Sequence, residues 1–158
     1  RDKWYYLISF VVFGLVVVNT GLRHEFYPSA CCQLVSRDDL ALLAWMEEEL
    51  PSTAKVLIAS ANLYVTALES PEIRTGVDGG IWVTPLTARD VVPDWQGLRL
   101  DAPEGHSQVC SRSLDYVYVG GMPQSFDADS LDAAPNWYQP VFSLPLAKIY
   151  RVVGCETP

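Results

Sequence analysis

The sequence is poor in histidine and lacks the standard catalytic motifs. It has only two histidines, His24 and His106, so an acid–base device built on imidazole has almost nothing to use. It has no GxSxG motif, no HExxH motif, no phosphate-binding loop and no GxGxxG fingerprint after a strand. We therefore expect no catalytic residue, no cofactor and no metal site in this chain. His106, flanked by Glu104, Gly105 and Ser107, is expected to be a solvated loop residue.

Positive charge is also scarce. Eleven Lys and Arg residues are scattered along the chain against nineteen Asp and Glu, which gives a net charge of -8. A nucleic-acid-binding face needs clustered Lys and Arg to neutralise phosphates, so this class of partner is excluded. The hydrophobic content of 49% over 158 residues is that of a folded protein with one core, without internal repeats or low-complexity segments.

One long segment has no charge at all. From Trp4 the chain reads WYYLISFVVFGLVVV, and the uncharged NTG extends this run to Leu22. As a helix with a rise of ~1.5 Å per residue it would be about 28 Å long, close to the ~30 Å of a bilayer's hydrocarbon. Arg1 and Lys3 precede the run, and an aromatic cluster opens it, as in an interfacial belt. We expect residues 1–23 to form a transmembrane helix with its flanks, in preference to a signal peptide or a buried core helix.

The flanking charges indicate an orientation. Arg1 and Lys3 favour a cytoplasmic amino-terminal end, although Arg23 on the other side weakens this bias. The rest of the chain would then lie outside the cytoplasm, periplasmic or extracellular, on a single-pass anchor. Because the sequence does not begin with Met, we expect either a processed protein or the tail of a longer one.

The four cysteines fit such an oxidising compartment. Cys31 and Cys32 are adjacent, Cys110 and Cys155 are far away, and there is no CxxC motif or histidine at zinc spacing. Adjacent cysteines rarely pair with each other, so a bridge between Cys110 and Cys155 is the simplest disulfide. Four buried free thiols are the alternative.

After an irregular linker over residues 24–35, we expect a small mixed α/β extracytoplasmic domain over residues 36–158. Ser36 and Asp39 stand at capping-box spacing and predict the start of a helix, whose apolar positions recur at intervals of three and four. The segments KVLIAS, LDYVYVGG, YQPVFS and LAKIYRVV predict strands, and the last two are close enough for a hairpin. The helix should have its apolar face at Leu42, Trp45, Met46 and Leu50.

Two long stretches between the strands, residues 95–113 and 122–137, are rich in Asp, Pro, Ser and Gly. We expect irregular loops there, of a length that usually binds or covers something. Asp127, Asp129 and Asp132 lack the Gly and the terminal Glu of a calcium loop, so they are expected to solvate the second loop.

The stretch VDGGIWVTPLTAR, residues 77–89, concentrates unusual residue types. Paired glycines can take positive φ or let another backbone approach closely, the carboxylate can accept backbone N–H groups, and the tryptophan offers a flat apolar platform. The structural interpretation is a turn leading into a short helix, with Trp82 in the core and Arg89 paired with a carboxylate. The functional interpretation is a rim that contacts a polyhydroxylated ligand or a partner, through Asp78, Gly79, Gly80, Trp82 and Arg89.

Four segments in order, LALLAWMEEELPSTAKVLIAS, VDGGIWVTPLTAR, DYVYVGG and PVFSLPLAKIYRV, carry a family likeness. Together they resemble the C-terminal extracytoplasmic region of bacterial polytopic membrane glycosyltransferases of the C superfamily, the dolichyl-phosphate-mannose-transferase-like proteins. The resemblance covers about residues 4–153. Its second motif is matched with one extra residue between Trp and Pro, at Asp78, Gly80, Trp82, Pro85, Leu86, Thr87 and Arg89.

The resemblance implies an origin among enzymes that use polyprenyl-linked sugars. Their catalysis rests on acidic residues in the first extracytoplasmic loop, between membrane helices that are not part of this sequence, so no residue here inherits that role. We expect a membrane-anchored domain of glycosyltransferase origin without a complete active site. The alternative is a single-span accessory subunit of a larger membrane complex, whose helix packs on partner helices and whose domain covers a partner's periplasmic face. The expected partners are the lipid bilayer, other membrane subunits, and a glycan or polyprenyl-linked sugar.

Overall fold

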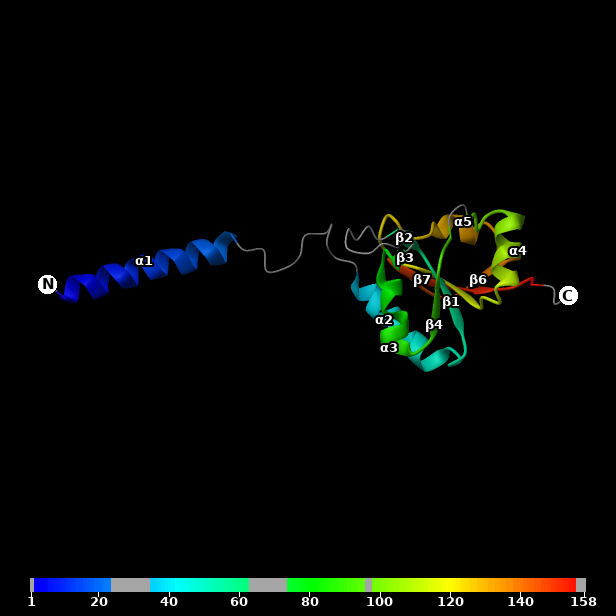
Figure 1. The fold of residues 1–158 in the computed structure, drawn as a ribbon, viewed down its shortest axis with the longest axis horizontal. Helices are drawn as coiled ribbons and strands as arrows, with labels where there is room; N and C mark the ends of the chain where they lie inside the picture. The colour runs from blue at the N-terminus through cyan, green and yellow to red at the C-terminus, as the bar shows by residue number, and fades with distance from the viewer. Residues whose placement is uncertain (1, 24–34, 63–73, 96–97, 156–158) are drawn as a thin grey trace, which may run out of the picture. The chain divides into compact units, whose positions relative to one another are not determined.

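The computed structural model describes residues 2–23, 35–62, 74–95 and 98–155 (Figure 1). The chain divides into two compact units, Arg1–Gln33 and Leu34–Pro158. His24, Cys31 and Cys32 of the expected linker lie outside the described residues.

The first unit contains the helix α1, from Asp2 to Arg23. Its segment Lys3–Gly21 has a mean hydropathy of 1.6, and none of it is buried. Large apolar side chains point outward all along it, with Phe10 76% exposed, for example. The prediction of an apolar amino-terminal helix is confirmed, and by length and composition this helix could cross a membrane.

The second unit is built on a five-stranded sheet of order β4-β1-β5-β7-β6 (Figure 1). β1 is parallel to both of its neighbours, whereas β7 is antiparallel to β5 and to β6. The predicted mixed α/β class is confirmed, together with the closing hairpin. The strands are β1 (Lys55–Ile58), β4 (Asp90–Pro93), β5 (Tyr116–Val119), β6 (Tyr138–Leu144) and β7 (Ala147–Val152).

Helices cover both faces of this sheet. The helices α2 (Arg37–Glu49) and α3 (Val83–Thr87) contribute to one core, and α4 (Pro103–Ser111) and α5 (Ala128–Asp132) contribute to the other. Successive side chains of a strand point to opposite faces, so β1 needs apolar residues at consecutive positions. Ile58 accordingly lies in the first core and Leu57 in the second.

The predicted start of α2 is confirmed. Ser36 Oγ accepts a hydrogen bond from Asp39 N at 3.1 Å, and Asp39 Oδ2 accepts one from Ser36 N at 2.7 Å, so the capping box is closed. On the apolar face Met46 is fully buried. Trp45 is half-buried and stacks on Phe142 with ring centroids 5.1 Å apart.

The sequence analysis missed β4, α4 and α5, and it also missed the pairing of two short strands, β2 (Ser60–Asn62) and β3 (Arg74–Gly76). β4 is a short edge strand, and the two helices lie within the stretches that were expected to be irregular loops. Both helices are too short for a clear apolar period, and their starts depend on local chemistry. Pro103 occupies the first helical position of α4, and Asp127 caps α5 by accepting a hydrogen bond from Asp129 N at 3.1 Å.

The expectation that the aspartates near α5 only solvate a loop is therefore wrong. Besides the cap made by Asp127, Asp132 accepts hydrogen bonds from Lys148 Nζ and Tyr150 Oη, both at 2.9 Å. These bonds tie α5 to β7. Lys148 and Tyr150 are distant from Asp132 in sequence, so a local pattern does not reveal that they bind it.

The carboxyl ends of β1 and β5 form a topological switch point. From β1 the chain continues through α3 to β4 on one side, and from β5 it continues through α5 to β6 and β7 on the other side. In open α/β sheets, ligands bind where neighbouring strands send their connections in opposite directions. A small antiparallel hairpin, β2 (Ser60–Asn62) and β3 (Arg74–Gly76), follows β1 at this edge.

A disulfide joins α4 to the segment that follows β7. Cys110 and Cys155 are bonded, with their Cα atoms 5.4 Å apart. His106, one helical turn before Cys110, is buried, donates from Nε2 to Val153 O at 2.7 Å, and stacks on Trp137. The expectation of a solvated loop histidine is wrong, because α4 turns this side chain inward. The disulfide and His106 together hold the end of the domain on α4.

We expect reduction to weaken the domain. The bridge spans a sequence separation of 45 residues, and for a loop of that size the chain-entropy estimate is about 4 kcal/mol of stabilisation. Peptide mapping of the denatured, unreduced chain should find the peptides of Cys110 and Cys155 linked, and reduction should lower the guanidinium midpoint of unfolding. A variant with Cys31→Ser and Cys32→Ser controls for thiol exchange. Free alkylation of Cys110 and Cys155 before reduction would contradict the bridge.

Candidate functional site

Residues 77–89 lie at the switch-point edge of the sheet. They form a 3-10 helix, η2 (Gly79–Trp82), which leads directly into α3. The turn and short helix of the structural interpretation are therefore present. Asp78, directly before η2, accepts a hydrogen bond from Gly120 N, directly after β5, and Gly80 lies against Ile58 at the end of β1. This stretch therefore packs over the carboxyl ends of β1 and β5.

Asp78 is the centre of this edge. It is fully buried, and three donors surround its carboxylate: Gly80 N at 2.9 Å from Oδ1, Gly120 N at 3.2 Å from Oδ2 and Ser125 Oγ at 2.5 Å from Oδ2. A buried carboxylate needs such donors to replace its lost hydration. One side chain thus ties the start of η2 to the end of β5 and to the loop before α5.

Burial raises the pKa of Asp78 above its ordinary value. Hydrogen bonds from Ser125 and Gly80 act against this shift, and the nearby charge of Asp39 adds to it. Perturbed carboxylates at a sheet edge are candidates for chemistry. Here, however, every donor to Asp78 is a backbone amide or hydroxyl that belongs to the fold itself, so the arrangement fixes the turn.

A second buried carboxylate lies beside the first. Tyr118 Oη donates a hydrogen bond to Asp39 Oδ1, and both residues are buried. Burial, and then the hydrogen bond to Asp39, raises the pKa of Tyr118 far above its usual range, so the phenol remains a donor. Asp39 therefore serves the capping box of α2 and anchors β5 at the same time.

Gly79 lies between these groups. A Cβ at this position would be 2.4 Å from Tyr118 Oη and 2.8 Å from Asp39 Cγ. At Gly80 a Cβ would be 2.9 Å from both Asp78 Oδ1 and Ile58 Cγ2. Neither glycine has a positive φ. Of the two roles that the sequence left open for the glycine pair, the structure shows close approach of neighbouring groups.

Among the residues that the structure describes, Arg89 pairs with backbone carbonyls and with no carboxylate, which corrects the structural interpretation. Its Nη2 donates to Glu47 O at 2.9 Å and to Leu50 O at 2.5 Å, and its Nη1 donates to Thr87 O. The last carbonyls of a helix have no partner within the helix, and the last turn of α2 has no basic residue of its own. Arg89 supplies both the donors and the positive charge. Backbone carbonyls as partners leave no trace in a sequence pattern.

Trp82 is not in the core, which is a second correction. It is 43% exposed, and Leu86, four residues later, is 48% exposed. Residues at this spacing share one helical face, and the positions turned inward are instead Val83 and Thr87. Among the five candidate contact residues, Asp78, Gly79 and Gly80 are thus enclosed and Arg89 is engaged, so Trp82 offers the accessible surface.

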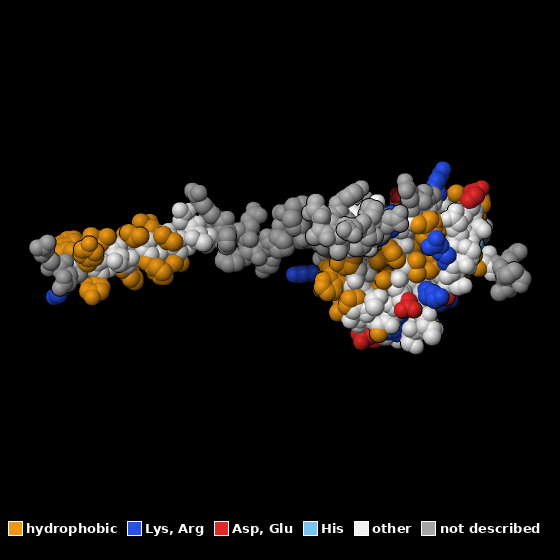
Figure 2. Space-filling model, viewed as in Figure 1, with side chains coloured by type: hydrophobic (Ala, Val, Ile, Leu, Met, Phe, Trp, Pro, Cys, Tyr) orange, Lys and Arg blue, Asp and Glu red, His pale blue; other side chains and the backbone are white. Residues whose placement is uncertain are grey.

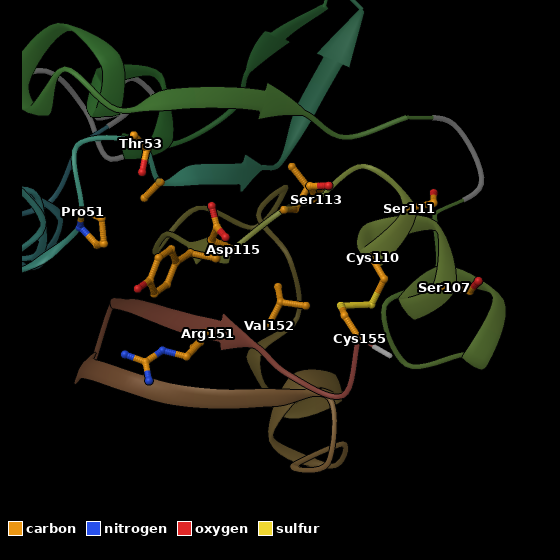
Figure 3. A pocket seen from close by; sticks show the side chains of 13 residues that line it. Pro51, Thr53, Ser107, Cys110, Ser111, Ser113, Asp115, Arg151, Val152 and Cys155 are labelled. Atoms are coloured by element: carbon orange, nitrogen blue, oxygen red, sulfur yellow. A yellow bond between two sulfur atoms is a disulfide. The ribbon is translucent and has the colours of Figure 1, made fainter. Parts of the chain in front are cut away.

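A hollow of about 680 Å³ lies at the opposite edge, where β1 and β5 begin (Figure 3). Asp115 on its wall accepts a hydrogen bond from Lys55 N at 2.8 Å and so links these two strands. The described lining contains one guanidinium, from Arg151, and no histidine. Such a surface can donate and accept hydrogen bonds, and Asp115 is the carboxylate of its described lining. Its hydroxyls come from Thr53, Ser107, Ser111, Ser113 and Tyr116.

The disulfide also forms part of that wall, as Figure 3 shows. The nitrogen and sulfur atoms of His106, Cys110 and Cys155 lie within 4.8 Å of one another, a spacing that could hold a metal ion. Because the two sulfurs are bonded to each other, neither can act as a thiolate ligand. The cluster is a disulfide packed beside a histidine.

Sequence reasoning missed Asp39, Tyr118, Gly120 and Ser125 as parts of the edge around Asp78. Asp39 was recognised only as a helix cap, and its second role depends on a residue 79 positions away. The one available signal was Gly120 and Gly121 directly after a strand, because glycines at the carboxyl end of a buried strand often admit another backbone. Ser125, in a Pro/Ser/Gly-rich loop, carried no signal.

Comparison with known proteins identifies no relative of this chain. No protein-family model, no curated protein and no solved structure matches this chain. The candidate site is therefore interpreted from its own geometry.

Gly79→Ala should destabilise the domain more than Trp82→Ala. The added methyl group would collide with Tyr118 Oη and break its bond to Asp39, which should cost about 1–3 kcal/mol. Removing a buried tryptophan costs about 3–5 kcal/mol, but one that is 43% exposed should cost less than about 1.5 kcal/mol. Guanidinium unfolding of the full chain in mild detergent, followed by near-ultraviolet circular dichroism, measures both. The reverse ranking would contradict the assignment of the two residues.

Proposed function

We propose that this chain is a membrane-anchored extracytoplasmic α/β domain of glycosyltransferase origin that acts by contact and has no active site of its own. The observation that carries the proposal is the exposure of α1. Thirteen large apolar side chains between Trp4 and Val18 are more than half exposed, and the described part of the chain buries none of them. In water they would cost on the order of 20 kcal/mol, so the helix requires a lipid or protein environment.

Two features support an orientation with the domain outside the cytoplasm. The disulfide is of a kind that persists in the periplasm or outside the cell and is rare in the cytosol. Lys3 precedes the apolar segment, in accordance with the tendency of positive residues to remain inside. We therefore propose a single-pass protein with a periplasmic or extracellular domain.

The non-catalytic role is supported by what the buried polar groups do. Asp39 and Asp78 accept hydrogen bonds from the backbone and from neighbouring hydroxyls, and His106 holds the end of the domain. Each of these groups is committed to the fold. The exposed Trp82, which extends from a rigidly held turn, is the feature suited to contact.

The proposed origin rests on the sequence resemblance, and the quoted segments lie together in the fold. The first forms α2 and β1, the second forms η2 and α3, and the last forms the β6–β7 hairpin. The first two are joined by Arg89, which binds carbonyls at the end of α2. The likeness therefore concerns one connected structural unit. A polyprenyl-linked sugar or another glycan could stack on Trp82 in such a unit.

A second function is favoured by the same exposed residues. In an accessory subunit, α1 would pack on partner helices, and Trp82 with Leu86 would meet a partner's extracytoplasmic face. Purification of the full chain in mild detergent with identification of co-purifying membrane proteins distinguishes this role. A stoichiometric partner supports the accessory subunit, and a pure monomer supports the anchored domain alone.

Val12→Arg tests the anchor. Val12 lies near the middle of the apolar segment, where arginine costs about 2.5–3.5 kcal/mol of insertion. The bound fraction after carbonate extraction and flotation should fall sharply for Val12→Arg, whereas Val12→Leu, the matched control, should behave as the parent. A Val12→Arg protein that floats as completely as Val12→Leu would refute the transmembrane anchor.

A further inference from the structure

The exposed apolar residues of the folded domain lie on and beside α2. Among the described residues of this unit, the large hydrophobic side chains that stand out as exposed are Leu40 at 55%, Trp82 at 43%, Leu86 at 48% and Leu146 at 54%. We call these four residues the apolar rim. On the face shown in Figure 2, hydrophobic side chains lie over the region where Figure 1 draws α2 and α3.

Hydrogen bonds and close contacts explain why the rim residues lie there. Leu146 N donates to Asp38 Oδ2 at 2.9 Å, which holds the β6–β7 turn against the first turn of α2. On the other side, Gly79 is packed against Asp39, which places η2 and its Trp82 beside the same turn. Leu40 follows Asp39 directly. Leu40, Trp82 and Leu146 therefore lie around the start of α2, and Leu86 follows one helical turn after Trp82 on α3.

The start of α2 is also the point at which the chain enters the domain. Twelve residues separate Arg23, the end of α1, from Ser36, the cap of α2. Even a fully extended connection of that length covers at most about 45 Å. If α1 is in a bilayer, as the proposed function states, this limit allows the start of α2 and the apolar rim to reach the lipid surface.

We propose that the apolar rim rests on the membrane surface, with Trp82 and the three leucines at the lipid headgroup–acyl boundary. This inference rests on the proposed anchor and adds a second, peripheral contact. Tryptophan suits this boundary because its ring is apolar and its edge carries a donor, and leucines add apolar area. A membrane-docked rim presents the switch-point edge of the sheet toward the lipid.

The charge distribution defines the type of lipid contact. Arg37 is the exposed basic residue next to the rim, whereas Glu47, Glu48 and Glu49 lie at the far end of α2. With a net charge of -8 the protein as a whole is repelled by anionic lipids. The contact is therefore apolar, and it forms on uncharged phosphatidylcholine.

The test uses the full chain, one copy per nanodisc, in phosphatidylcholine with or without brominated acyl chains. Bromine quenches tryptophan fluorescence only at short range, so the emission of one tryptophan is obtained as the difference between the parent and its Trp→Phe variant. The signal assigned by Trp82→Phe should be quenched at least twofold in brominated discs. The signal assigned by Trp137→Phe should not change, because Trp137 directly precedes the start of β6 at the opposite edge of the sheet.

The fluorescence of Trp4, obtained from the Trp4→Phe variant, distinguishes the proposed anchor from the proposed docking of the rim. If Trp4 is quenched and Trp82 is not, the anchor stands and rim docking is overturned, and a Trp82 shielded from aqueous quenchers would then point to a protein partner. If Trp4 is not quenched, the anchor itself is overturned.

A charge placed on the rim provides the matched variant. Leu40→Asp should restore at least half of the Trp82 emission in brominated discs, while the fold is kept, since an aspartate near the start of a helix is favourable. Thr53→Asp, an exposed position at the opposite edge, is the control and should leave the quenching of Trp82 unchanged. Equal quenching in Leu40→Asp, Thr53→Asp and the parent would contradict docking through the rim.

Discussion

The buried carboxylate of Asp78 is the constraint on which the rest of this edge depends. Its hydrogen bonds to Gly80, Gly120 and Ser125 join segments that lie more than forty residues apart in the chain. Burial of the carboxylate is tolerated because these three donors replace its hydration. The carboxylate in turn holds the three donors together. Gly79 and Gly120 leave room for this packing, since a Cβ on either would overlap the groups around the carboxylates.

The hydrogen bonds at this edge of the sheet explain how Trp82 can be exposed and still hold a fixed position. Trp82 follows a turn that is fixed by Asp78 at its start, and Arg89 fixes the end of α3 to the last carbonyls of α2. Between these two points the backbone has little freedom, so Trp82 and Leu86 are held outward together. A contact surface with this preorganisation loses little conformational entropy on binding. This is the physical basis for a role in contact without chemistry of its own.

Much of the fold could be predicted from the sequence because its signals are local. The capping box of Ser36 and Asp39, the apolar run of β1 and the closing hairpin each follow from neighbouring residues. The helices α4 and α5 were missed because they are short and begin with a proline and an aspartate within polar stretches. The roles of Arg89, Trp82 and His106 were wrong for another reason: each depends on backbone atoms or faces that only the tertiary fold brings together.

A double-mutant cycle between Asp78 and Ser125 tests the central claim most directly. Asp78→Ala, Ser125→Ala and the double variant would be unfolded with guanidinium as full chains in mild detergent. If the carboxylate ties η2 to the loop before α5, the two changes should couple by about 1.5–3 kcal/mol, as for a hydrogen bond to a charged group. Additive effects, with a coupling indistinguishable from zero, would contradict the claim that Asp78 holds the edge together.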